Sequence, residues 1–211
     1  NYLDENDEMV LDPFMLRNFE QANIDIFATR LDFTKSFEAG YNLEVGAKLS
    51  MVITDNDTKF EALENGNWEN QVNRTNNFIY DEEVMATYAN VSKSFGKINV
   101  QAGLRMEHTK SEGNSLTLDE NVPREYTDFF PSLSLSHSIG KKHSLSYNYS
   151  RRINRPNYQD LNPFIGYLDD YTFSKGNPFL NPQYSNAFGI NYGFGNSFFV
   201  SANYSRTKDA I

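Results

Sequence analysis

The sequence lacks several features that define common protein classes. It has no cysteine, which excludes a disulfide framework and a thiolate metal site. It has no run of 18 apolar residues, so it offers no candidate for a transmembrane helix. Basic residues are outnumbered, with 19 Lys and Arg against 28 Asp and Glu in 211 residues. A net charge of −9 argues against nucleic-acid binding, which requires a basic face.

The sequence also lacks motifs for catalysis and for targeting. There is no hydrolase elbow, phosphate loop or zinc-binding helix motif, so we expect neither an enzyme nor a cofactor. His108, His137 and His143 sit at the ends of different predicted strands, and we do not expect them to bind a metal. The acidic segment 1–20 is interpreted as a solvated loop. Its opening residues do not form a signal peptide, and we expect the natural chain to begin well before Asn1.

What the sequence does contain is a series of alternating apolar and polar residues with period two, which is typical of β-strands. The clearest strand, 41–54, has apolar residues at the odd positions and mostly polar residues or glycine at the even ones. In the first strand Ile24 and Ile26 lie on the opposite face from Phe27, which suggests a bulge or a switch of face. The predicted strands are 22–36, 41–54, 82–94, 98–109, 128–138, 143–153, 184–194 and 197–207.

The connections between these strands alternate in length. Short turns are predicted at 37–40, 95–97, 139–142 and 195–196, and long loops at 55–81, 110–127 and 154–183. Short periplasmic turns and longer extracellular loops are typical of an outer-membrane β-barrel. One face of the strands is apolar and ends in aromatic residues, whereas the other is polar. In the third strand we expect Val84, Ala86 and Tyr88 to face outward. A mean hydropathy of −0.62 is compatible with such a barrel, since only alternate residues face lipid. A soluble β-sandwich remains the alternative.

The connection 154–183 is unusual in its composition. Pro156 stops the preceding strand from continuing in a ladder, and three Asn-Pro pairs favour turns. Between these breaks the segment contains many aromatic residues, which disordered segments lack. Ordered connections of this length usually have a function.

Two motifs in this connection carry a resemblance to a known family. The pattern R-x-x-R-P-x-Y-x-x-L-N-P-F spans Arg152 to Phe164, and G-N-P-x-L-x-P spans Gly176 to Pro182. Together they resemble the barrel of TonB-dependent receptors, and most of all the outer membrane protein beta-barrel family. The segment QAGLRMEHT, beginning at Gln101, resembles a strand of the same receptors. Gln183 departs from the family pattern, which usually has Glu there.

The resemblance covers all 211 residues and implies a fold and a function. It implies an all-β, antiparallel, up-and-down transmembrane barrel in the outer membrane, with residues 1–211 forming about eight strands of a barrel of about 22. It also implies a plug domain outside these residues, through which the TonB energy-transducing complex acts. The chain would then help to import an iron chelate, corrinoid, glycan or peptide. The alternative is a non-transporting barrel, such as an adhesin, a structural barrel or a passive pore.

The candidate ligand-binding residues lie at the mouth of the sixth strand and in the loop after it. Guanidinium groups bind carboxylates in a bidentate manner, so the three arginines there either contact an anionic ligand or pair with Asp160, Asp169 or Asp170 to fix the loop. Tyrosines of the loop either stack on a ligand or pack the loop upon itself. The candidate ligand-binding residues are Arg151, Arg152, Arg155, Tyr158, Tyr167 and Tyr171. The motif residues with an expected structural role are Pro156, Leu161, Asn162, Pro163, Gly176, Asn177, Pro178 and Pro182.

Overall fold

The computed structural model describes residues 15–167, 172–195 and 197–209, and nearly all of these residues are in β-strands. Eight long strands form one antiparallel sheet. One short helix and three short strands lie in the connections. The elements are β1 (Leu16–Ser36), β2 (Tyr41–Glu64), β3 (Asn67–Asn70), β4 (Asn76–Phe95), β5 (Ile98–Ser115), β6 (Glu120–Ile139), β7 (His143–Asn154), α1 (Tyr158–Leu161), β8 (Ile165–Tyr167), β9 (Phe173–Lys175), β10 (Gln183–Phe194) and β11 (Phe198–Lys208).

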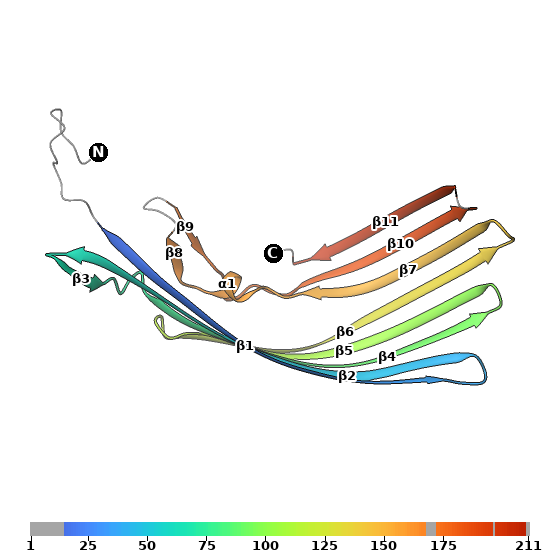
Figure 1. Ribbon diagram of the computed structural model, residues 1–211, viewed down its shortest axis with the longest axis horizontal. Coiled ribbons are helices and arrows are strands. Elements are labelled where there is room, and N and C mark those ends of the chain that lie inside the picture. The colour runs from blue at the N-terminus through green and yellow to red at the C-terminus, as the bar shows by residue number, and fades with distance from the viewer. Residues whose placement is uncertain (1–14, 168–171, 196, 210–211) are drawn as a thin grey trace, which may run out of the picture.

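The long strands follow each other in the sheet in the order β1-β2-β4-β5-β6-β7-β10-β11. Each pairing keeps a single register along its whole length. The sheet is bent into an open trough, with all four short turns at one end (Figure 1). The predicted all-β, antiparallel, up-and-down architecture of a barrel segment is therefore confirmed. The described residues include no helix that is long and apolar enough to cross a membrane.

The two faces of the sheet differ in chemistry. The convex face presents large apolar side chains to the surroundings, such as Leu31, Leu104 and Phe188, which are 76%, 50% and 48% exposed. The concave face carries charged side chains such as Lys48, Arg105 and Glu107, among a smaller number of apolar ones. This is the arrangement of a membrane barrel, in which the outer face contacts lipid and the inner face contacts water.

The first five long strands are longer than predicted from the sequence, and two predicted loops are wrong over most of their length. β2 has 24 residues, and β2, β3 and β4 together take in most of the predicted loop 55–81. Likewise, β5 and β6 take in most of the predicted loop 110–127. About 9–11 residues suffice to cross the hydrocarbon layer, so these strands continue beyond it. There the convex face becomes polar, which is why the sequence resembles a loop while the ladder hydrogen bonds persist.

The prediction for the facing of β4 was also wrong. Val84, Ala86 and Tyr88 line the concave face, next to Lys48 and Arg105, whereas Met85 faces outward and is 47% exposed. The register with β2, which pairs Ala86 with Lys48, fixes this choice. Both sets of side chains in β4 are of mixed polarity, so alternation alone does not decide which one faces lipid.

The expected bulge in the first strand is absent. The β1–β2 register is unbroken from Leu16↔Ala62 to Ser36↔Asn42. Ile24 and Ile26 therefore lie on the concave side of β1, and they are 52% and 70% exposed. Because β1 is an edge strand of the described sheet, no neighbour covers these side chains.

Candidate functional site

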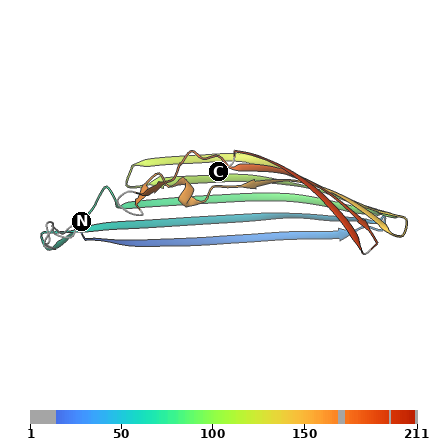
Figure 2. The same ribbon diagram turned by 90° about the horizontal axis from the view of Figure 1, so that it is seen from above.

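The segment between β7 and β10 folds back into the trough. Figure 1 shows α1, β8 and β9 on the concave side, and in the view from above they lie over the strands (Figure 2). The short helix α1 is closed at its start by a capping box, in which the side chain of Asn157 accepts from the backbone N–H of Asp160 and the Asp160 carboxylate accepts from that of Asn157. Such reciprocal caps satisfy donors that a helix start leaves unpaired.

The two halves of the sequence motif meet in this loop. The backbone N–H of Gly176 donates to the carbonyl of Asn162 at 3.0 Å, and that of Asn177 donates to the carbonyl of Asp160 at 2.7 Å. A Cβ atom at Gly176 would lie only 2.5–2.6 Å from three backbone carbonyl oxygens. Glycine is therefore required where the second half of the motif packs against the first. We call this contact the motif clamp.

The motif clamp is anchored to the wall of the trough. Leu161 is 4% exposed and packs with Phe78 and Tyr80 of β4, and Tyr158 and Leu180 pack against the same cluster. Burial raises the pKa of Tyr80 to about 12, and Glu82 adds to this effect. The Asn162 side chain accepts from the amide of Asn76 at 3.2 Å, and Arg124 of β6 donates to the carbonyls of Pro178 and Leu180. The motif residues Pro156, Pro163 and Pro182 are buried.

Arg155 is the most engaged of the three candidate arginines. Its guanidinium donates to Glu107 at 2.7 Å, to Thr109 at 2.8 Å and to the Tyr126 hydroxyl at 3.2 Å. Burial acts to lower the pKa of Arg155, but the hydrogen bonds and charges of Glu107 and Tyr126 together outweigh it, so the pKa is raised. The arginine thus fixes the loop, although its partners are side chains of β5 and β6 rather than the predicted acids. Asp160 caps α1 instead, and Asp169 and Asp170 lie outside the described residues.

Arg151 and Arg152 have different surroundings. Arg151 donates to the carbonyl of Phe129 at 3.1 Å and lies 3.7 Å from the carboxylate of Asp128. These contacts lie just beyond the point where the β6–β7 ladder ends, at Ser132↔Ser150. Arg152 has no hydrogen bond or ion pair with any residue that the structure describes.

Of the three candidate tyrosines, Tyr158 is the one whose side chain the structure describes. Tyr158 packs against the hydrophobic cluster beneath α1, so packing of the loop accounts for it. The backbone of Tyr167 lies in β8, but its side chain is outside the described part of the structure. Tyr171 falls wholly outside the described residues.

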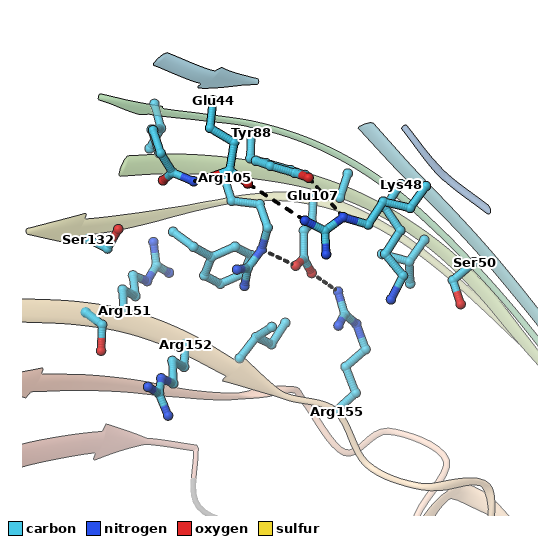
Figure 3. A pocket seen from close by; sticks show the side chains of 18 of the residues that line it. Glu44, Lys48, Ser50, Tyr88, Arg105, Glu107, Ser132, Arg151, Arg152 and Arg155 are labelled. Carbon is cyan, nitrogen blue, oxygen red and sulfur yellow. Dashed lines mark hydrogen bonds and ion pairs between the residues drawn. The ribbon is translucent and has the colours of Figure 1, made fainter. Parts of the chain in front are cut away.

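The strand wall lines an open cavity of about 760 Å³, to which the start of the loop contributes Arg155. All three candidate arginines line it. Figure 3 shows Arg151 and Arg152 on one side and Lys48 on the other, with Arg105 and Glu107 between them. Arg30, Lys48 and Arg105 were not among the candidate residues predicted from the sequence. The alternation of β2 and β5 already places Lys48 and Arg105 on the polar face, and strand pairing brings them together.

Two of the cations that line the cavity have no partner among the residues that the structure describes. Arg30 lies 2.7 Å from Asp32 and 3.8 Å from Glu44, and Arg105 lies 2.6 Å from Glu107. Every carboxylate in and beside the cavity therefore has a guanidinium neighbour. Lys48, like Arg152, has no hydrogen bond or ion pair among the described residues. The surplus charge of the cavity is positive.

The described residues contain no group of three or more His, Asp or Glu side chains that could hold a metal ion. His108 bonds to Thr127 at 2.9 Å and lies 3.3 Å from Glu125. His143 bonds to the Tyr192 hydroxyl at 2.7 Å. The cavity therefore offers donors to an anion rather than a ready set of metal ligands.

Comparison with solved structures shows the same fold in two transporters and an uptake receptor. The unliganded ferric citrate transporter FecA matches with a TM-score of 0.65 and 13% identity, over 86% of this chain and 27% of that one. The copper transporter OprC matches with a TM-score of 0.68 and 12% identity, over 90% of this chain and 31% of that one. The ferric yersiniabactin uptake receptor FyuA from Yersinia pestis matches with a TM-score of 0.53 and 11% identity, over 93% of this chain and 30% of that one.

This chain spans less than a third of the length of each of these three structures. No curated protein matches it. The family model for the outer membrane protein beta-barrel family matches residues 1–211, and the resemblance found in the sequence is confirmed. The chain therefore belongs to the outer membrane protein beta-barrel family, and its strands form part of a barrel in the outer membrane.

Proposed function

We propose that this chain is a wall segment of an outer-membrane receptor that imports a scarce nutrient, and that the cavity beneath the β7–β10 loop is part of the ligand path. The observation that carries the proposal is the inward fold of that loop. It narrows the trough on the side of the long connections, which is the extracellular side of such barrels. A docked loop of this kind narrows the entrance and makes it selective.

The charges of the cavity favour a ligand with carboxylate or phosphate groups. Lys48 and Arg152 face the same cavity from β2 and β7, and neither has an anionic partner among the described residues. Ammonium and guanidinium groups bind such anions by charge-assisted hydrogen bonds. An anionic iron chelate or an acidic peptide fits this pair better than a neutral glycan does.

The proposal agrees with the kinds of protein that share the fold. FecA is a ferric citrate transporter, OprC a copper transporter and FyuA a ferric yersiniabactin uptake receptor. We extend this to energy coupling through TonB, acting on a plug domain in the complete protein.

The test is uptake of ferric citrate, used as an anionic probe, by cells that carry the full-length protein in their outer membrane. We expect uptake to depend on the gene and on TonB, and to fall about tenfold in a Lys48→Gln/Arg152→Gln variant through loss of two charge-assisted contacts. The matched control is Lys59→Gln/Lys110→Gln, because these lysines lie outside the cavity and pair with Glu61 and Glu125. Uptake that is independent of TonB would contradict import by an energised receptor. Equal uptake by both variants would contradict the anion path.

A further inference from the structure

Half of the lysines in this acidic chain are at the end of the trough that carries the short turns. Five of the ten, Lys35, Lys93, Lys97, Lys141 and Lys142, lie in or beside the first three turns. We call the segments 35–41, 93–98 and 137–143, together with the described residues 194–195 and 197–198, the turn rim. All four segments lie together at one end of the sheet (Figure 1). By the rule that short turns are periplasmic, the turn rim is at the inner surface of the outer membrane.

Three of these lysines lie over aromatic rings of the turn rim. The Nζ atom of Lys93 is 3.6 Å from the ring centre of Tyr41 and 5.0 Å from that of Phe95. Lys35 lies 5.0 Å from the ring of Phe37, and Lys142 lies 6.0 Å from that of Phe194. Ammonium groups are attracted to ring faces. The rings hold these cations at the level where aromatic belts meet lipid head groups.

The turn-rim lysines lack acidic partners. Glu38 is the one acid in the four segments, and no ion pair joins any of the five lysines to a carboxylate of the described residues. The opposite end of the convex face differs. There Lys59 lies 2.8 Å from Glu61, and Lys110 lies 3.6 Å from Glu125. Positive charge at the turn rim therefore exceeds the single negative charge of Glu38, and no ion pair among the described residues neutralises it.

We propose that the turn rim is a binding surface for the phosphate groups of anionic phospholipids in the periplasmic leaflet. Lys35 follows Phe33 by two residues in β1, and Lys93 follows Val91 by two residues in β4. Each lysine therefore lies on the same, lipid-facing side of the sheet as that apolar residue. Their aliphatic stems lie along the apolar belt while the ammonium groups reach the head groups. A basic segment beside a membrane gains attraction from each additional anionic lipid. This inference does not depend on import.

The experiment measures thermal unfolding of the full-length protein in detergent during titration with phosphatidylglycerol or phosphatidylethanolamine. The wild type should unfold at a higher temperature with phosphatidylglycerol, and half-saturation should need about tenfold less of it. A Lys35→Gln/Lys93→Gln/Lys97→Gln/Lys142→Gln variant should lose this preference. Lys59→Gln/Lys110→Gln, which removes two lysines from the opposite end, should keep it.

Two results would overturn the proposal. One is an equal preference for phosphatidylglycerol in the fourfold variant and the wild type. The other is the same upward shift with inorganic phosphate, which would show a site for the free anion instead of a lipid surface. If the fourfold variant does not assemble, Lys93→Gln and Lys93→Arg decide the matter, because only the glutamine variant should weaken the preference.

Discussion

The concave wall has two halves that differ in how they are covered. In the half under the β7–β10 loop, Phe78, Thr109 and Ser115 are at most 1% exposed. In the other half, which we call the open half, β7, β10 and β11 run towards the short turns, and Asn148 and Asn203 are exposed. The backbone of both halves consists of antiparallel strands joined by ladder hydrogen bonds. The difference lies in one loop that supplies apolar side chains, carbonyl groups and an arginine to the first half only.

This comparison shows that the polar face of a barrel strand is not a single environment. Under the loop, polar side chains such as Asn76 and Glu107 are buried and bonded to loop residues, so removing a partner leaves an unsatisfied group behind. In the open half a polar side chain that loses its partner has water as a replacement. Substitutions in the two halves should therefore have unequal effects.

The largest effect is expected from Arg155→Met. This change leaves Glu107 and Thr109 without the guanidinium that connects the loop to the wall, and removing one partner of a buried ion pair costs about 3 kcal/mol. Hydrogen exchange of the backbone amides of Asn162 and Gly176, measured on the full-length protein, should accelerate by about two orders of magnitude.

Glu107→Leu in the Arg155→Met background provides the control. It removes the carboxylate that has lost Arg155 and now pairs with Arg105 alone, and it leaves the partly exposed Arg105 to water, so part of the lost protection should return. Unchanged exchange in the single variant would show that the loop is held without the ion pair.

Gly176→Ala should have the next largest effect, about 2 kcal/mol, because its Cβ would collide with backbone carbonyls that cannot move independently. The matched control is Gly166→Ala in the same loop, where the nearest atom is the mobile hydroxyl of Ser174 at 3.3 Å. Limited proteolysis of intact outer membranes should cut the Gly176→Ala loop readily and leave the Gly166→Ala loop protected. Equal cleavage of the two would refute the motif clamp.

A smaller effect is expected from alkaline pH. The pKa of Tyr80 is raised to about 12 in the folded protein, against about 10 in an unfolded chain. The folded state therefore holds its proton where the unfolded state loses it, and stability falls as the pH rises from 10 towards 12. At pH 11 the loss is about 1 kcal/mol. In a Tyr80→Phe variant, the hydrogen-exchange protection of the loop amides should fall less steeply with pH over this range. Identical pH profiles in the variant and the wild type would show that Tyr80 is not responsible for the loss.

The smallest effect belongs to the open half. Gly189→Ala places its Cβ 3.0 Å from the side-chain oxygen of Asn203, which is exposed and can rotate away. We expect a change within about 0.5 kcal/mol, measured by the same exchange and proteolysis assays. A loss as large as that of Gly176→Ala would erase the distinction between the two halves.

Much of the fold could be predicted from the sequence because lipid and water impose opposite demands on alternate residues. Strands such as 41–54 and 98–109 show this pattern clearly, and the faces of Leu104 and Arg105 follow from it. In β4 the pattern fails, since Val84, Ala86 and Tyr88 are apolar or amphipathic on the concave face. The strand ends were missed because the extensions of β2 and β6 lie where both faces are polar.

The site was predictable only in part. The motifs located the loop, its turns and its arginines, since proline and glycine act through local backbone geometry. The partners of Arg155 were out of reach, because Glu107 and Tyr126 lie 48 and 29 residues away in the chain, and only the strand register brings them beside it. Lys48 joins the cavity for the same reason.

The way in which the loop reaches across the sheet has a consequence for assembly. Every pairing of long strands joins neighbours in the sheet order that follow each other along the chain, so hairpins can be added one after another with short-range contacts. The loop instead touches β4, β5 and β6 at once, through Asn76, Glu107 and Arg124. It can settle only after those three strands have taken their final register. Docking of the loop thus depends on correct strand register. In a chain with a misregistered hairpin the loop would stay undocked and exposed to extracellular proteases.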